Sequence, residues 1–131
     1  MTDRPGGGIS HLDIETIDQD GVVVMVVSGD IDITNVNQAR VAVEEQMNHH
    51  PEGIVVCLAV GFFASTGLSL LAEANQRARL AGIRFAVVAP GRATRRALEA
   101  TGLDQVLPLH ETVPHAVEAL RTSTTAEPTT L

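Results

Sequence analysis

The chain has 131 residues, of which 44% are hydrophobic, and its sixteen acidic and nine basic residues give a formal charge of −7. This length and apolar content suit a single domain with its own core, and the lone cysteine, Cys57, excludes an intrachain disulfide. The negative charge argues against nucleic-acid binding, and no apolar run approaches the roughly 20 residues of a membrane span.

Both ends of the chain have the composition of flexible tails. Residues 1–11, "MTDRPGGGISH", combine proline with three consecutive glycines, and residues 122–131, "TSTTAEPTTL", are polar. The first segment has neither the basic start nor the apolar stretch of a signal peptide, so we expect a cytoplasmic protein. The folded domain is expected over residues 12–121.

Between these tails the sequence alternates strand and helix patterns. "LDIETI" alternates apolar and polar residues, "VVVMVVS" is a β-branched run, and "DQDG" between them predicts a hairpin. Beyond them, apolar residues at helical spacing alternate with further short apolar runs. In chain order we expect strands at 12–17 and 22–28, a helix at 35–48, a strand at 53–58, a helix at 66–81, a strand at 83–89, a helix at 92–103, a strand at 105–109 and a helix at 112–120.

Local signals support the ends of three of these helices. Thr34 or Asn35 is a possible cap of the first helix, Gly102 is a candidate left-handed residue after the third, and Pro114 suits the first turn of the last. A hairpin followed by alternating strands and helices indicates an α/β sheet with parallel pairing and right-handed crossovers. In such sheets, function is typically found at the carboxyl edge of the strands.

Two segments on that edge, "GDID" and "GFFAST", carry the candidate functional residues. Asp30 and Asp32 share a side if the strand continues and splay apart if it turns; one of them could also cap the first helix. Ser65 is expected to be the N-cap of a helix that begins at Thr66. The same geometry favours an anion, so the domain itself would tolerate a phosphate on Ser65.

Catalysis and metal binding find no support in the sequence. Two aspartates are too few for a metal site, and the five histidines have no zinc-binding spacing. A serine nucleophile elbow needs glycine two residues before and after the serine; Gly67 fits, but Phe63 occupies the other position. The glycines at 6–8 lie in the N-terminal tail and not between a strand and a helix, so the sequence has no phosphate-binding loop. We therefore expect no enzyme, cofactor or metal.

Three motifs resemble those of STAS domains, specifically the stand-alone bacterial anti-anti-sigma factors, over residues 12–121. "VSGDID" is similar to the family's Gly-Glu-Ile/Leu-Asp turn, and "VGFFASTGLSLL" to its Asp-Ser-Ser/Thr-Gly-Leu segment. "TRRALEATGLDQVLPLHETVPHAVEAL" is similar to its C-terminal pattern. The resemblance implies an α/β fold, a STAS-like mixed β-sheet of about five strands with about four α-helices in a single domain.

The same resemblance implies a partner switch that regulates transcription. In this family the unphosphorylated antagonist binds an anti-sigma factor, a kinase of the histidine-kinase-like ATPase class, and thereby frees a sigma factor. The kinase phosphorylates the serine that corresponds to Ser65, with Thr66 as the alternative acceptor, and a phosphatase restores the complex. The implied contact surface consists of Asp30, Asp32, Phe63, Ala64, Ser65, Thr66 and Gly67.

Two positions depart from the family pattern. Ala64 stands where the family has an aspartate before the serine, and Val56 stands where a second aspartate is usual. Both changes remove acidic groups, which either alters kinase recognition or leaves this member regulated by something other than phosphorylation. Two other functions stay open: a STAS scaffold module in a stress-signalling or transport system, and a small-ligand-binding domain. Phe63 is the candidate exposed aromatic anchor, and Cys57 is expected to be buried and inert.

Overall fold

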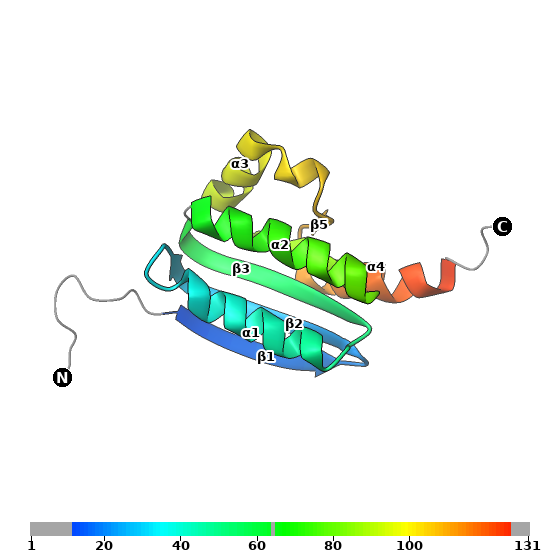
Figure 1. Ribbon diagram of the computed structural model, residues 1–131. Coiled ribbons are helices and arrows are strands. Elements are labelled where there is room, and N and C mark those ends of the chain that lie inside the picture. The colour runs from blue at the N-terminus through cyan, green and yellow to red at the C-terminus, as the bar shows by residue number, and fades with distance from the viewer. Residues whose placement is uncertain (1–11, 64, 127–131) are drawn as a thin grey trace.

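The computed structural model describes residues 12–63 and 65–126, without the side chains of Phe62, Phe63 and residues 122–126. These residues form a five-stranded mixed sheet with the strand order β1-β2-β3-β4-β5 (Figure 1). The elements are β1 (Leu12–Gln19), β2 (Val22–Ile31), α1 (Val36–Asn48), β3 (Gly53–Phe63), α2 (Ser65–Ala81), β4 (Arg84–Val88), α3 (Arg92–Thr101), the 3₁₀ turn η1 (Leu103–Gln105), β5 (Leu109–His110) and α4 (Val113–Ala126).

The sheet begins with the predicted hairpin and continues with parallel strands. β1 and β2 pair antiparallel around Asp20 and Gly21, whose φ angles of 56° and 93° are both left-handed. Two left-handed residues match the right-handed twist of the flanking strands, and the Gly21 amide also donates to Asp18 Oδ1 at 3.0 Å. The remaining pairs, β2 with β3, β3 with β4, and β4 with β5, are parallel, as the alternation of strands and helices predicts.

Helices cover both faces of the sheet. α1 and α2 lie over one face, where Met25 and Val27 of β2 join the larger of two hydrophobic clusters (Figure 1). α4 packs on the other face against Val22 and Val24 of the same strand, and Cys57 belongs to this second cluster. Because successive side chains point to opposite faces, a strand buried on both needs a continuous apolar run, which "VVVMVVS" supplies.

The largest differences from the boundaries predicted from the sequence concern β3, β5 and α4. β3 extends to Phe63, five residues further than expected, because β2 also continues and keeps it paired as far as Ile31 opposite Phe63. The strand expected at 105–109 is largely η1 and a turn, and β5 contains only two residues. The helix expected at 112–120 is α4, which begins at Val113 and continues to Ala126. The expected tail at 1–11 lies outside the described residues, and so do residues 127–131 of the tail expected at 122–131, while residues 122–126 belong to α4. None of the described helices has the length and apolar character of a membrane span.

Candidate functional site

The structure brings "GDID" and "GFFAST" together at the carboxyl edge of the sheet. Asp30 lies opposite Phe62 in the β2–β3 ladder, after a register shift that leaves Gly61 as the extra residue of β3. A Cβ placed on Gly61 would stand 3.2 Å from Asp30 Oδ1, so the carboxylate lies directly against the end of β3. The starts of α1 and α2 lie at this same end of the molecule (Figure 1).

The two aspartates have different surroundings. The amide of Thr34 donates to Asp32 Oδ1 at 2.9 Å, and the Thr34 hydroxyl donates to the same oxygen. These bonds form an Asx turn, so Asp32 shapes the connection from β2 to α1. Asp30, in contrast, is exposed on the strand. Of the two, Asp30 has the carboxylate that is better placed to contact another molecule.

The buried side chain of Asn35 stabilises the turn between β2 and α1. It is 2% exposed and occupies the cap position of α1, but its side chain makes no capping hydrogen bond. Instead its Nδ2 donates to the Asp30 carbonyl at 2.7 Å and its Oδ1 accepts from the Asp32 amide at 3.0 Å. The predicted alternative of Asn35 as the cap residue is confirmed by position, while its amide serves the preceding loop.

Ile33 is a member of this edge that sequence reasoning missed. It is 76% exposed at the tip of the β2–α1 turn, between two polar neighbours. Removing a large apolar side chain from water is favourable, so an exposed isoleucine three residues after Asp30 suits contact with a partner. The sequence feature that could have indicated Ile33 is an isoleucine within a polar turn, where the fold offers no apolar neighbours for it to pack against.

α2 begins at Ser65, one residue earlier than expected. Ser65 is therefore the first helical residue instead of the N-cap, and the cap position falls on Ala64, which lies outside the described residues. Ser65 is exposed, and the amides of the first helical turn have no partners within the helix. The local field of those amides still favours an anion at this position, as the sequence predicted.

The other expected contact residues are placed less favourably or are not described. Thr66 Oγ1 is buried and has no hydrogen-bond partner among the described residues. Gly67 is buried and lines a cavity of about 10 Å³ beneath α2. The side chain of Phe63, the candidate anchor, lies outside the described part of the chain. Ser65 thus has the accessible hydroxyl, and Thr66 does not.

Two further findings concern metal binding and cysteine reactivity. No group of three or more His, Cys, Asp or Glu side chains among them could hold a metal ion. Cys57 is buried against the α4 face, and this burial raises the pKa of its thiol. A thiol that stays protonated is a poor nucleophile, which agrees with the expectation of a buried, unreactive cysteine.

Comparison with known proteins identifies the family. The STAS domain family matches residues 13–116. The chain is also 32% identical over 111 residues to the anti-sigma-F factor antagonist RsfB of Mycobacterium tuberculosis, an alignment that covers 84% of this chain and 90% of the relative. The chain belongs to the STAS domain family.

Further comparisons agree with this assignment. This STAS domain is 31% identical over 103 residues to the anti-sigma-F factor antagonist RsfA of Mycobacterium tuberculosis, covering 76% of this chain and 80% of the relative. The crystal structure of an anti-sigma factor antagonist from Mycobacterium paratuberculosis superposes with a TM-score of 0.78 at 35% identity, over 85% of this chain and 95% of that one. The expected STAS-like sheet of five strands with four helices is confirmed.

Proposed function

We propose that this protein is an anti-sigma factor antagonist, which binds an anti-sigma factor and so releases a sigma factor for transcription. The observation that carries the proposal is the identity of 32% and 31% with two proteins named as anti-sigma-F factor antagonists. Each alignment covers most of this chain and most of the relative, so the similarity extends over most of the domain. The partner we infer is an anti-sigma factor of the histidine-kinase-like ATPase class.

The carboxyl edge of the sheet is the proposed contact surface. Ile33 would supply apolar area, and the exposed Asp30 carboxylate, placed against the end of β3, would supply charge complementarity. Ser65 lies at the start of the next helix. Phe63 and Ala64 are members of this surface by family resemblance alone. Thr66 and Gly67 would support it from beneath, since Thr66 Oγ1 and Gly67 are buried.

Phosphorylation of Ser65 is the proposed regulation. A kinase needs an accessible hydroxyl, which the exposed Ser65 has and the buried Thr66 Oγ1 lacks. A phosphoserine at the start of α2 would be stabilised by the helix amides, so the domain would remain folded. The added charge of about −1.5 to −2 would oppose burial in the complex, and a phosphatase would restore binding.

A small-ligand function has less support from the geometry. The cavity that Gly67 lines has a volume of about 10 Å³, which is room for no more than a water molecule. Two larger hollows among the described residues are lined by other parts of the chain. A STAS scaffold role would be distinguished from the antagonist role by the partner that the protein captures.

The test is to capture partners from a lysate of the source organism with the wild-type protein and with Ser65→Glu. We expect the wild type to retain an ATPase-class anti-sigma factor and the variant to lose it. Incubating the captured pair with ATP and mapping phosphate by mass spectrometry then distinguishes Ser65 from Thr66. If neither protein retains such a factor, the proposed function is wrong; if phosphate is found on Thr66, the regulatory site is.

A further inference from the structure

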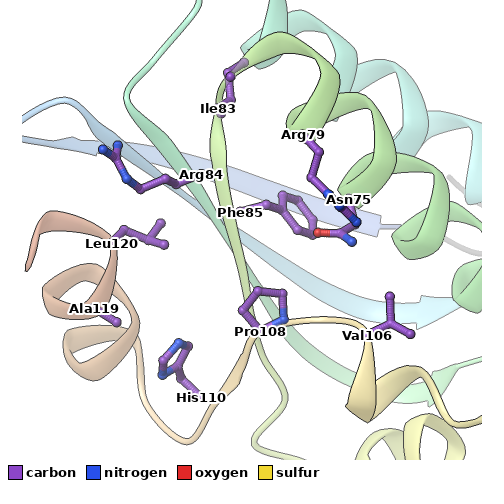
Figure 2. Close-up of a pocket in the computed structure, with 11 residues that line it drawn as sticks. Asn75, Arg79, Ile83, Arg84, Phe85, Val106, Pro108, His110, Ala119 and Leu120 are labelled. Atoms are coloured by element: carbon purple, nitrogen blue, oxygen red, sulfur yellow. The ribbon is translucent and has the colours of Figure 1, made fainter. Parts of the chain in front are cut away.

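A groove of about 570 Å³ opens along the edge of β4, away from Ser65. Figure 2 shows β4 running between the C-terminal half of α2 and the side of α4, with Val106 and Pro108 closing one end. Asn75 and Arg79 of α2 line the groove, and Asn75 is ten residues along the helix from Ser65, or about 15 Å. The groove and the proposed anti-sigma surface therefore share no residue.

The groove exposes an unpaired length of sheet edge. β5 pairs with Val87 and Val88 alone, which leaves the first half of β4 without a neighbour on that side among the described residues. Arg84 donates its amide toward β3, to the Glu52 carbonyl, and Val87 donates toward β5, to the Pro108 carbonyl. Because successive residues of a strand turn their main-chain groups to opposite sides, the N–H and C=O of Phe85 face the groove.

Pro108 explains why the ladder stops there. Continuing the register that places Leu109 opposite Val87 would make residue 108 the donor to the Phe85 carbonyl. A proline has no N–H, so this bond cannot form, and the chain turns away through Val106. The open edge is thus a consequence of the sequence, and an added strand could satisfy it.

Asn75 is the second observation that points to a ligand. It is 7% exposed, lines the groove and makes no hydrogen bond within the part of the chain that the structure describes. Among the described residues, Thr66 Oγ1 is the only fully buried side-chain nitrogen or oxygen atom without a hydrogen-bond partner, so the Asn75 carboxamide is still reached from the groove and is available to a ligand. Its donor and acceptor match those of a peptide group, and Figure 2 places it beside Phe85.

The charges around the groove select the kind of peptide. Arg79, Arg84 and His110 line it, and no aspartate or glutamate does. Neither arginine is in an ion pair with a described residue, and Arg84 Nη1 only donates to the Glu52 carbonyl at 3.3 Å. In a chain with a formal charge of −7, a hollow lined only by basic ionisable groups favours an acidic occupant.

We propose that this groove binds an extended acidic segment of a partner protein, which adds a strand to the open edge of β4. Phe85 and Asn75 hold the main chain of the segment, Arg79 and Arg84 meet its carboxylates, and Val106, which is 58% exposed, packs against its apolar side chains. The protein would then have two interaction surfaces, one switched at Ser65 and one independent of it.

Titration of the ¹⁵N-labelled protein, followed by NMR, tests the proposal with two capped hexapeptides, Val-Glu-Glu-Val-Glu-Glu and Val-Lys-Lys-Val-Lys-Lys. Because successive side chains of a strand point to opposite faces, each peptide presents charges both to Arg79 on the α2 face and to Arg84 on the α4 face. The acidic peptide is expected to shift the Phe85 amide and the Asn75 side-chain amide, and the lysine peptide to bind about tenfold more weakly or not at all. The double variant Arg79→Glu with Arg84→Glu should weaken the acidic peptide about tenfold, while Arg95→Glu on exposed α3 should leave it unchanged.

A separate variant tests the carboxamide. Asn75→Leu keeps the approximate volume but removes both hydrogen-bonding groups, so we expect about tenfold weaker binding with no loss of stability. A purely structural Asn75 would instead show lower stability and unchanged binding. Equal affinity for the two peptides would overturn the proposal, and so would chemical shift changes confined to Ile33 and Ser65. Groove resonances that move when the protein alone is diluted would also overturn it, because they would show that a second copy of the chain occupies the groove.

Discussion

Ile33→Ala is expected to weaken binding of the anti-sigma factor without destabilising the antagonist. Because the Ile33 side chain is 76% exposed, the fold makes little use of it, and surface truncations of this kind usually change the free energy of unfolding by less than about 0.5 kcal/mol. Its apolar surface contributes only when a partner covers it. The substitution therefore separates binding from folding.

The expected magnitude follows from the atoms removed. Isoleucine to alanine deletes three carbon atoms, each contributing about 0.8 kcal/mol when fully buried. Since about three quarters of the side chain is available to a partner, the loss is about 2 kcal/mol, or about thirtyfold in Kd. This estimate assumes that the partner covers the tip of the β2–α1 turn completely.

The assay is isothermal titration of the captured anti-sigma factor, with Leu80→Ala as a matched control. Leu80 is 79% exposed, nearly the same as Ile33, but it lies near the C-terminal end of α2. We expect the control to bind like the wild type. If Ile33→Ala binds like the wild type, or if Leu80→Ala loses as much affinity, the carboxyl edge is not the contact surface.

Three further predictions concern the fold. Asn35→Ala removes the two hydrogen bonds that hold the β2–α1 turn and should lower the free energy of unfolding in urea by about 2 to 3 kcal/mol. Gly102→Ala should lower it by about 1 kcal/mol, because its φ of 79° is left-handed although no atom would contact the new Cβ. Cys57, whose thiol pKa is raised by burial, should react with Ellman's reagent at pH 8 far more slowly in the folded protein than in urea.

Each of these has a result that would contradict it. An unchanged urea midpoint for Asn35→Ala would mean that the turn does not depend on the buried amide. A Gly102→Ala protein as stable as the wild type would contradict the strain argument; Gly82, with a φ of 73° and equally open surroundings, offers a second position to compare. Equal reaction rates for folded and unfolded Cys57 would contradict its burial.

Turn chemistry was predictable because its cause is local. "DQDG" predicts the hairpin, and the structure confirms it with left-handed φ angles at Asp20 and Gly21. Gly102 is left-handed after α3, as its position predicts. In both cases the residues that determine the conformation are neighbours in sequence, so a short window contains the relevant information.

The ends of the strands were not predictable in the same way. β3 continues to Phe63 because β2, far away in sequence, resumes pairing after the register shift at Gly29 and Asp30. The fifth strand shrinks to Leu109 and His110, since the pairing is limited by the proline before it. A strand's length depends on its partner, which a pattern in one segment does not contain.

The candidate site was also predictable only in part. The general rule for carboxyl edges predicts that Asp30 and Ser65 lie at one end of the sheet. The separate surroundings of Asp30 and Asp32 depend on the side chains of Thr34 and Asn35, which only the folded turn brings together. Asn75 gives no signal in the sequence beyond its place on the inner face of a helix, because its missing partner is a tertiary property.

The central claim is that the unmodified carboxyl edge binds an anti-sigma factor and that negative charge at Ser65 releases it. The most direct measurement is the Kd of the captured anti-sigma factor for wild type, Ser65→Ala and Ser65→Glu by calorimetry. We expect wild type and Ser65→Ala to bind alike and Ser65→Glu to bind about a hundredfold more weakly, a loss of roughly 3 kcal/mol. Equal binding of Ser65→Glu and wild type would contradict the switch, and no binding by the wild type would contradict the function.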